Sequence, residues 1–157
     1  MEEQRQNDLR SEITLRDMED ADLPRVFEIE LACHPHDAWP DSEFTERLVD
    51  SREFCLVTEV NGEIAGFVIY RRRWFKLHLE SVAVHPSYRR QGIARHMVKH
   101  LIEDLPRQGR SRIVLEVRKS NTAAQACYLQ LGFRVVGQKE RYYWPDEEDA
   151  LLMRYSS

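Results

Sequence analysis

The sequence has 157 residues, of which 42% are hydrophobic and 32% are charged, so it can build a sizeable core and is not a disordered chain. Its 23 lysines and arginines and its 27 aspartates and glutamates give a net charge of −4. This charge argues against a domain whose main role is to coat nucleic acid, although it leaves room for a local basic patch. No apolar run approaches the roughly 18 to 20 residues of a spanning helix. We therefore expect a cytoplasmic protein with no nucleic-acid or membrane partner.

The domain organisation follows from the distribution of apolar residues. Residues 1–11 are almost entirely polar or charged, which predicts a flexible tail and no signal peptide. Residues 12–157 are of a length typical of one domain. The three cysteines, Cys33, Cys55 and Cys127, are too widely spaced for a disulfide framework or a metal knuckle, so we expect reduced thiols.

The first half of the chain predicts a strand, two helices and a hairpin. Residues 13–16 favour a short strand, and Asp20, Asp22 and Pro24 are start signals for a helix that ends near residues 33–35. After a loop with two prolines, Asp41 or Ser42 can cap a second helix that runs through residue 49. Asn61-Gly62 is typical of a two-residue turn, here between strands at 54–60 and 64–70.

The second half alternates strand and helix patterns. Its predicted strands are residues 76–84, 112–117, 133–143 and 150–155. Its predicted helices are residues 93–105 and 121–131, the second closed by Gly132. These patterns indicate a mixed α/β sheet with an antiparallel start, two strand–helix units, a closing hairpin and helices on both faces.

The most informative segment is VAVHPSYRRQGIAR, residues 82–95, where a strand leads through a glycine-containing loop into a helix. Backbone amides and the dipole at a helix N-terminus favour an anion such as phosphate, and Arg89, Arg90 and Arg95 add positive charge. Gly92 allows close approach of the backbone. An ordinary solvated loop with a helix cap explains the spacing equally well. The segment has neither the Gly-Lys-Ser/Thr of an ATP-binding P-loop nor the GxGxxG of a dinucleotide site, which argues against ATP and NAD.

Three motifs together resemble the GNAT family of N-acetyltransferases. RRQGIA, residues 89–94, is similar to the family's motif A, with Ala94 in place of the more usual second glycine. LEVRKSNTAAQACYLQLGF, residues 115–133, resembles motif B. RYYWP and the later DALLM, residues 141–145 and 149–153, resemble the end of the branch that acetylates N-terminal amines. Within the family the likeness is greatest to the RimI group, the bacterial ribosomal-protein-alanine acetyltransferases.

The resemblance implies a fold and a reaction. The implied GNAT fold has a mixed, mostly antiparallel sheet of about seven strands, flanked by about four helices and splayed at a cofactor cleft. The implied reaction is acetyl transfer from acetyl-CoA to the N-terminal α-amine of a protein, with a ribosomal protein as candidate, by direct attack in a ternary complex. The alternatives are a small amine as acceptor (a polyamine, an amino acid or an antibiotic) and a catalytically silent acyl-CoA-binding domain. No metal is expected.

The same resemblance implies roles for individual residues. Glu116 is the expected general base, with Glu80 as its rival, and Tyr128 is the expected general acid. A solvated strand glutamate and a core tyrosine are the alternatives for Glu116 and Tyr128. Tyr142 and Tyr143 either shape a peptide slot or form cross-strand aromatic pairs. The expected cofactor-binding residues are Val82, Ala83, Val84, Arg89, Arg90, Gln91, Gly92, Ile93, Ala94, Arg95 and Asn121.

Overall fold

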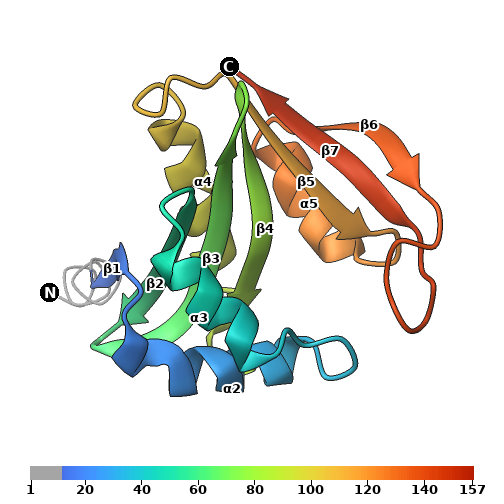
Figure 1. The fold of residues 1–157 in the computed structure, drawn as a ribbon. Coiled ribbons are helices and arrows are strands. Elements are labelled where there is room, and N and C mark those ends of the chain that lie inside the picture. The colour runs from blue at the N-terminus through green and yellow to red at the C-terminus, as the bar shows by residue number, and fades with distance from the viewer. Residues whose placement is uncertain (1–11) are drawn as a thin grey trace, which may run out of the picture.

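A seven-stranded sheet organises the computed structural model, which describes residues 12–157 (Figure 1). The strand order is β1-β2-β3-β4-β5-β7-β6. Only β4 and β5 run parallel, and the other neighbouring strands are antiparallel. The predicted mixed, mostly antiparallel sheet is confirmed, whereas the predicted tail at residues 1–11 lies outside the described residues. The strands are β1 (Ile13–Asp17), β2 (Glu53–Val60), β3 (Glu63–Arg73), β4 (Lys76–Val84), β5 (Arg112–Arg118), β6 (Arg134–Lys139) and β7 (Ala150–Ser156).

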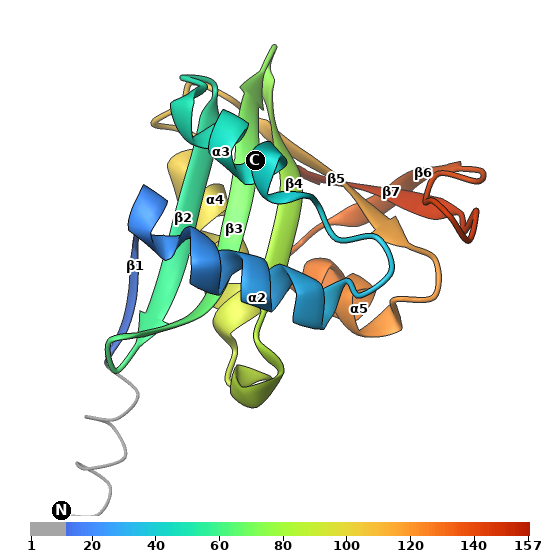
Figure 2. The ribbon, with the colours of Figure 1, turned by 60° about the horizontal axis from the view of Figure 1, so that its bottom comes forward.

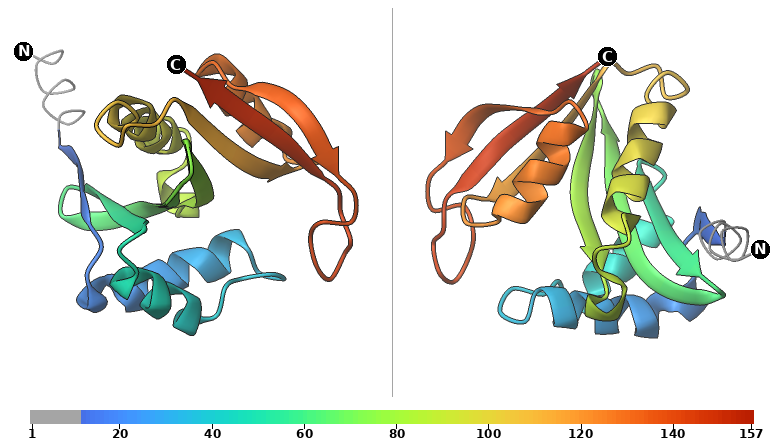
Figure 3. Two further views of the ribbon diagram at one scale, coloured as in Figure 1. Left: turned by 45° about the horizontal axis from the view of Figure 1, so that its top comes forward. Right: turned by 180° about the vertical axis from the view of Figure 1, so that it is seen from behind.

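Helices cover both faces of the sheet, as the sequence predicts. One face carries α2 (Leu23–Cys33) and α3 (Asp41–Val49), which come forward in Figure 2. The other face carries α4 (Ile93–Asp104) and α5 (Thr122–Gln130), in front of the sheet in the right panel of Figure 3. The short turns η1 (Asp20–Asp22) and η2 (Pro86–Tyr88) precede α2 and α4. Within residues 12–157, no helix is long and apolar enough to cross a membrane.

The helix faces explain the two clusters of the core. Val26 and Ile29 of α2 and Phe44 of α3 are almost fully buried against one face of the sheet. Met97 and Leu101 of α4 are fully buried against the other. Each helix therefore buries an apolar stripe against the sheet, as the spacing of its apolar residues requires.

The strands β4 and β5 pair only over their first residues. The register joins Lys76–Leu79 to Arg112–Leu115 and ends there. Beyond it, β4 stays paired with β3 as far as Val84, and β5 stays paired with β7 as far as Arg118. The two halves of the sheet thus part in the middle of β4, as the diverging ribbons in Figure 1 show. The expected splay between these strands is confirmed.

A β-bulge in β4 lies where the parting begins. Tyr70 of β3 pairs with Leu79, whereas Ile69 pairs with Ser81, so Glu80 is an extra residue in β4. One extra residue reverses the alternation of side chains and strengthens the local bend of a strand. The side chains of Val82 and Val84 consequently pack in the same cluster as those of Leu77 and Leu79.

The strand predicted at residues 133–143 is shorter than expected. It ends at Lys139, and residues 140–149 form a loop instead. Arg141 has a positive φ of 52°, and its amide donates a hydrogen bond of 2.9 Å to the carboxylate of Asp149. The Tyr143 amide donates to the carbonyl of Glu148 at 3.1 Å. The loop satisfies these amides internally, so they do not continue the sheet ladder.

Candidate active site

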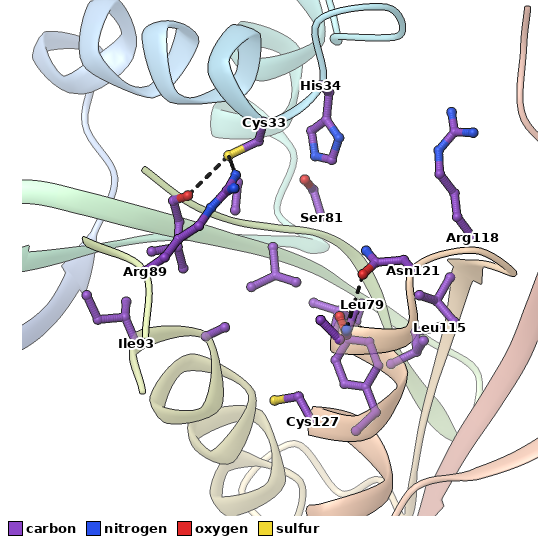
Figure 4. Close-up of a pocket in the computed structure, with 18 of the residues that line it drawn as sticks. Cys33, His34, Leu79, Ser81, Arg89, Ile93, Leu115, Arg118, Asn121 and Cys127 are labelled. Carbon is purple, nitrogen blue, oxygen red and sulfur yellow. Dashed lines mark hydrogen bonds between the residues drawn. The ribbon is translucent and has the colours of Figure 1, made fainter. Parts of the chain in front are cut away.

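A cleft of about 740 Å³ opens where β4 and β5 part. It is bordered by residues 79–84 of β4, residues 115–118 of β5, the end of α2, the loop before α4 and one face of α5. Figure 4 shows Arg89 and Ile93 at one end of this cleft and His34 and Arg118 at the other, with Cys127 below. The two ends differ in charge and are described in turn.

The loop before α4 forms an anion-binding end. Arg90 and Gly92 both have positive φ, of 64° and 75°. A Cβ at Gly92 would meet nothing within 4 Å, so its backbone conformation rather than lack of space favours glycine. The first helical hydrogen bond runs from the His96 amide to the Gly92 carbonyl at 2.9 Å. The amides of residues 93–95 precede it and have no acceptor within the helix, which leaves them available to an anion.

Arginines add charge at this end. Arg89, Arg90 and Arg95 all line the cleft, as predicted. The Arg95 guanidinium is oriented by Gln130 of α5, with Nη1 3.1 Å from Oε1. Arg89 lies 3.8 Å from the Cys33 sulfur, which itself donates a hydrogen bond to a carbonyl at the end of β4 (Figure 4). Positive charge and unpaired amides thus lie together.

Glu116 is held in the cleft by a histidine and a lysine. Its Oε2 lies 2.7 Å from Nε2 of His78, and its Oε1 lies 3.5 Å from Nζ of Lys139. Burial raises the pKa of the carboxyl, but the hydrogen bond from His78 and the charges of His78 and Lys139 outweigh it, and the pKa is lowered. Glu116 is therefore an ionised carboxylate at neutral pH, and its side chain is only 15% exposed.

Glu80, the rival base, also lines the cleft, but its carboxylate is engaged elsewhere. Its Oε2 lies 2.9 Å from Nη2 of Arg47, whose guanidinium stacks 4.1 Å from the ring of Trp39. Its Oε1 is buried without a hydrogen-bond partner. The neighbouring Glu53 has a pKa raised to about 7, first by burial and then by its contact with Glu80. These contacts make Glu80 part of a buried charge network beneath α3.

Tyr128 and Asn121 share one face of α5 and both line the cleft. The Asn121 side chain accepts a hydrogen bond of 3.2 Å from the Ala124 amide, which confirms its predicted place as helix cap. Tyr128 is only 7% exposed and packs against Phe133, with 5.6 Å between ring centroids. Burial raises the pKa of its hydroxyl well above the usual range, so the phenol remains protonated at neutral pH.

The opposite end of the cleft carries a network that sequence reasoning missed. Arg118 contacts Asp37 of the α2–α3 loop at 2.5 Å and Asp146 of the β6–β7 loop at 2.7 Å. Its guanidinium lies 4.2 Å from the ring centroid of Tyr143. Arg118 thus joins two loops across the mouth of the cleft. Its position two residues after Glu116, on the same face of β5, is the signal in the sequence that could have identified it.

Glu30 of α2 also lines the cleft and was not predicted as a site residue. It is 1% exposed, and its pKa is raised to about 7, first by burial and then by the charge of Asp37. His34 Nε2 lies 3.4 Å from its Oε1. This end of the cleft consequently combines the carboxyl groups of Glu30 and Asp37 with the guanidinium of Arg118. The other end has three arginines instead.

The structure brings nearly all predicted site residues together. Each of the expected cofactor-binding residues lines the cleft except Gln91, which is exposed. Tyr143 lines the cleft, whereas Tyr142 does not. The two tyrosines pack edge to face at 5.0 Å within one loop, so the cross-strand pairing that was the alternative is wrong. Among residues 12–157, no group of three or more His, Cys, Asp or Glu side chains is placed to hold a metal ion.

The chain matches known proteins along most of its length. The model of the acetyltransferase (GNAT) family matches residues 23–133. The ribosomal protein bS18-alanine N-acetyltransferase of Escherichia coli is 34% identical over 142 residues, which cover 89% of this chain and 95% of that protein. N-alpha-acetyltransferase RimI of Mycobacterium tuberculosis is 31% identical over 150 residues, 92% of this chain and 93% of that protein.

The fold agrees with these matches. The crystal structure of the ribosomal-protein-S18-alanine N-acetyltransferase from Escherichia coli aligns with a TM-score of 0.84 at 34% identity. The alignment covers 92% of this chain and 93% of that one. The chain therefore belongs to the acetyltransferase (GNAT) family and is an N-acetyltransferase.

Proposed function

We propose that the protein transfers the acetyl group of acetyl-CoA to the N-terminal α-amine of a protein, with the N-terminal alanine of a ribosomal protein as acceptor. The observation that carries this proposal is the charge polarity of the cleft between β4 and β5. Arginines and unpaired amides at one end suit an anionic cosubstrate. Away from that end, the ionised carboxylate of Glu116, together with the carboxyl groups of Glu30 and Asp37, suits an ammonium group. The names of relatives at 31% to 34% identity support an α-amine as acceptor and support alanine as the first residue tested.

The backbone of β4 supports a binding mode for acetyl-CoA. Residues 81–84 pair with β3 along one edge, while the edge toward β5 has no strand partner after Leu79. An extended pantetheine arm can add to such an edge as a strand would, with Val82, Ala83 and Val84 supplying backbone groups. The amides and arginines of residues 89–95 would hold the pyrophosphate, and Asn121 would contact the arm from α5.

Two residues of the cleft, Glu116 and Tyr128, carry out the proton transfers. Bound acetyl-CoA supplies an electrophilic thioester carbonyl and a thiolate leaving group. Glu116 takes the proton that the attacking amine loses, directly or through water, because it is ionised at neutral pH. Tyr128 donates its phenolic proton to the departing sulfur, because burial keeps that phenol protonated. An amide C–N bond forms, the C–S bond breaks, and both side chains return to their starting states by exchange with water.

Direct attack by the amine needs no covalent enzyme intermediate, and the thiol next to Tyr128 in sequence is poorly suited to form one. Cys127 lines the cleft, and burial raises the pKa of its thiol. A buried thiol without a basic partner has little thiolate and is a weak nucleophile. We therefore place the reaction in a ternary complex of protein, acetyl-CoA and acceptor.

The proposal is tested by supplying purified protein with acetyl-CoA and peptides that begin with Ala, Ser, Met or Thr. A peptide with a blocked N-terminus and a free lysine is the matched control. Release of CoA is followed, and the modified atom is located by mass analysis of the product. Acetylation confined to the α-amine of the alanine peptide is the expected result. Saturable binding of acetyl-CoA without transfer to any peptide would refute the proposal, and a panel of polyamines and amino acids would then identify a small acceptor.

A further inference from the structure

The turn between β3 and β4 carries a surface that the catalytic cleft does not use. We call it the hairpin-tip surface and define it by Arg72, Arg73, Trp74, Phe75, Lys76 and Arg110. The side chains of Trp74 and Phe75 are 83% and 72% exposed, and their ring centroids are 5.5 Å apart. Adjacent apolar side chains that are exposed in this way mark interaction sites on soluble proteins. The two rings are therefore a candidate binding site.

The surroundings of these rings are strongly basic. The surface rims a hollow of about 770 Å³, and no acidic residue lines it. The two other arginines that line it, Arg52 and Arg71, are each paired with a carboxylate, that of Asp50 among them. The four cations of the hairpin-tip surface form no ion pair within residues 12–157. In a chain with a net charge of −4, this is a local concentration of uncompensated positive charge.

The geometry of the turn holds these groups in place. The Arg110 guanidinium donates a hydrogen bond of 3.2 Å to the carbonyl of Arg73, which ties the loop after α4 to the hairpin. Phe75 adopts a positive φ of 59° in the turn. The tip lies at the top of Figure 1, close to the C-terminus, whereas the loop before α4 lies at the opposite end of β4. No residue lines both hollows.

From this combination we propose that the hairpin-tip surface binds single-stranded nucleic acid. The arginines and Lys76 contact successive phosphates, and the rings of Trp74 and Phe75 stack with unpaired bases. An acidic peptide would satisfy the cations but offers no flat ring to cover the two aromatic side chains. The net charge of the chain argues against nucleic acid as its main partner. We therefore confine the proposed contact to the hairpin-tip surface.

Binding is measured by fluorescence anisotropy of a short labelled RNA strand of mixed sequence with the full-length protein, in the absence of acetyl-CoA. Four phosphate contacts predict a slope of about −3 in a plot of log affinity against log salt concentration. Affinity should thus fall about 50-fold between about 50 and about 200 mM salt. Reversal of two charges, Arg72→Glu with Arg73→Glu, should flatten that slope to about −1.5. Trp74→Ala should weaken binding roughly fivefold or more by removing a stacking platform.

Matched controls use exposed residues away from the hairpin-tip surface, one on β6 and one on the β6–β7 loop. Trp144→Ala removes another exposed ring, and Arg134→Glu reverses another exposed cation. Both should leave RNA affinity within about twofold. The proposal is overturned if wild type binds RNA no better than the double charge reversal, or if the control variants weaken binding as much. It is also overturned if oligoglutamate binds as tightly as RNA and Trp74→Ala has no effect, since the surface would then recognise an acidic peptide. Peptide acetylation by the Arg72, Arg73 and Trp74 variants should match wild type, which separates this test from that of the proposed function.

Discussion

Replacement of Glu116 by Gln tests the proposed general base most directly. Gln keeps the size of the side chain and can still hydrogen-bond to His78, but it cannot accept a proton. General acid–base catalysis typically contributes at least about 100-fold to a rate. We therefore expect kcat/KM to fall about 100-fold or more, while the Kd for acetyl-CoA stays within about twofold.

The contacts of Glu116 also predict the pH dependence of the reaction. Its lowered pKa means that the carboxylate is already ionised well below neutral pH, so it does not limit the rate there. An N-terminal amine has a pKa of about 7.7 to 8 and must be neutral to attack. The kcat/KM of wild type should consequently rise with pH up to about 8 and then level off, and Glu116 should add no second step between about pH 5 and 7.

The variant His78→Ala changes this profile in a calculable direction. A hydrogen bond to a charged group contributes about 1.5 to 3 kcal/mol, which corresponds to a pKa shift of about one to two units. Burial, the largest influence on the pKa of Glu116, raises it and would then be opposed only by Lys139. A second step, from Glu116, should therefore appear on the acid side of the profile below the step of the amine, about one to two units above the wild-type pKa of Glu116, while the rate near pH 9 changes little.

These effects are measured as CoA release from pH 5 to 9 with the accepted peptide. Glu140→Gln is the matched control, because Glu140 is exposed on the neighbouring loop and forms no ion pair among the described residues. An E116Q protein within twofold of wild type would refute the role of Glu116 and direct attention to Glu80 or to water. A profile of the His78 variant that still shows only the step of the amine between pH 5 and 9 would refute the electrostatic argument.

Three further results are expected. Tyr128→Phe should lower kcat at least tenfold without changing the Kd for acetyl-CoA, and an unchanged kcat under single-turnover conditions would exclude its acid role. Arg118→Ala should raise the KM for peptide more than it lowers kcat, because the substitution removes the contacts to Asp37 and Asp146 that join the two loops. A KM equal to that of wild type would contradict this. Leu101→Ala should lower the free energy of unfolding by about 2 to 5 kcal/mol in urea denaturation, because Leu101 is fully buried on the face of α4 that packs against the sheet. A loss below about 1 kcal/mol would contradict its place in the core.

The sequence was most informative where local chemistry determines local structure. Asn61-Gly62 predicted the tight turn between β2 and β3, and Asn61 has the required positive φ of 53°. Asn121 predicted the start of α5, which its side chain caps. The helical spacing of apolar residues predicted a helix over residues 93–105, and α4 runs from Ile93 to Asp104. In each case the residue and its neighbours in sequence are sufficient to predict the local structure, because no partner distant in sequence is involved.

The candidate site was predictable only in part, because several of its groups meet through tertiary contacts. Tyr128 and Glu116 carried motif signals, whereas the partner of Glu116, His78, lies on a different strand and has no distinguishing neighbour in sequence. Arg118 acts on loops that are distant in sequence, at Asp37 and Asp146. The early end of β6 had a different, local cause, since the amides after it are satisfied within their own loop.

The bulge at Glu80 shows how a feature invisible in the sequence creates the site. Without the extra residue, Val82 and Val84 would face α2, and Ala83 would face the cluster under α4, the reverse of what is observed. The bulge sits directly after the last residue of β4 that pairs with β5, so the change of face and the parting of the strands begin at one point. Glu80 is also held by Arg47 beneath α3, so we expect its carboxylate to stabilise the bend that opens the cleft. We therefore propose that Glu80 serves the shape of the site and that Glu116 takes the proton.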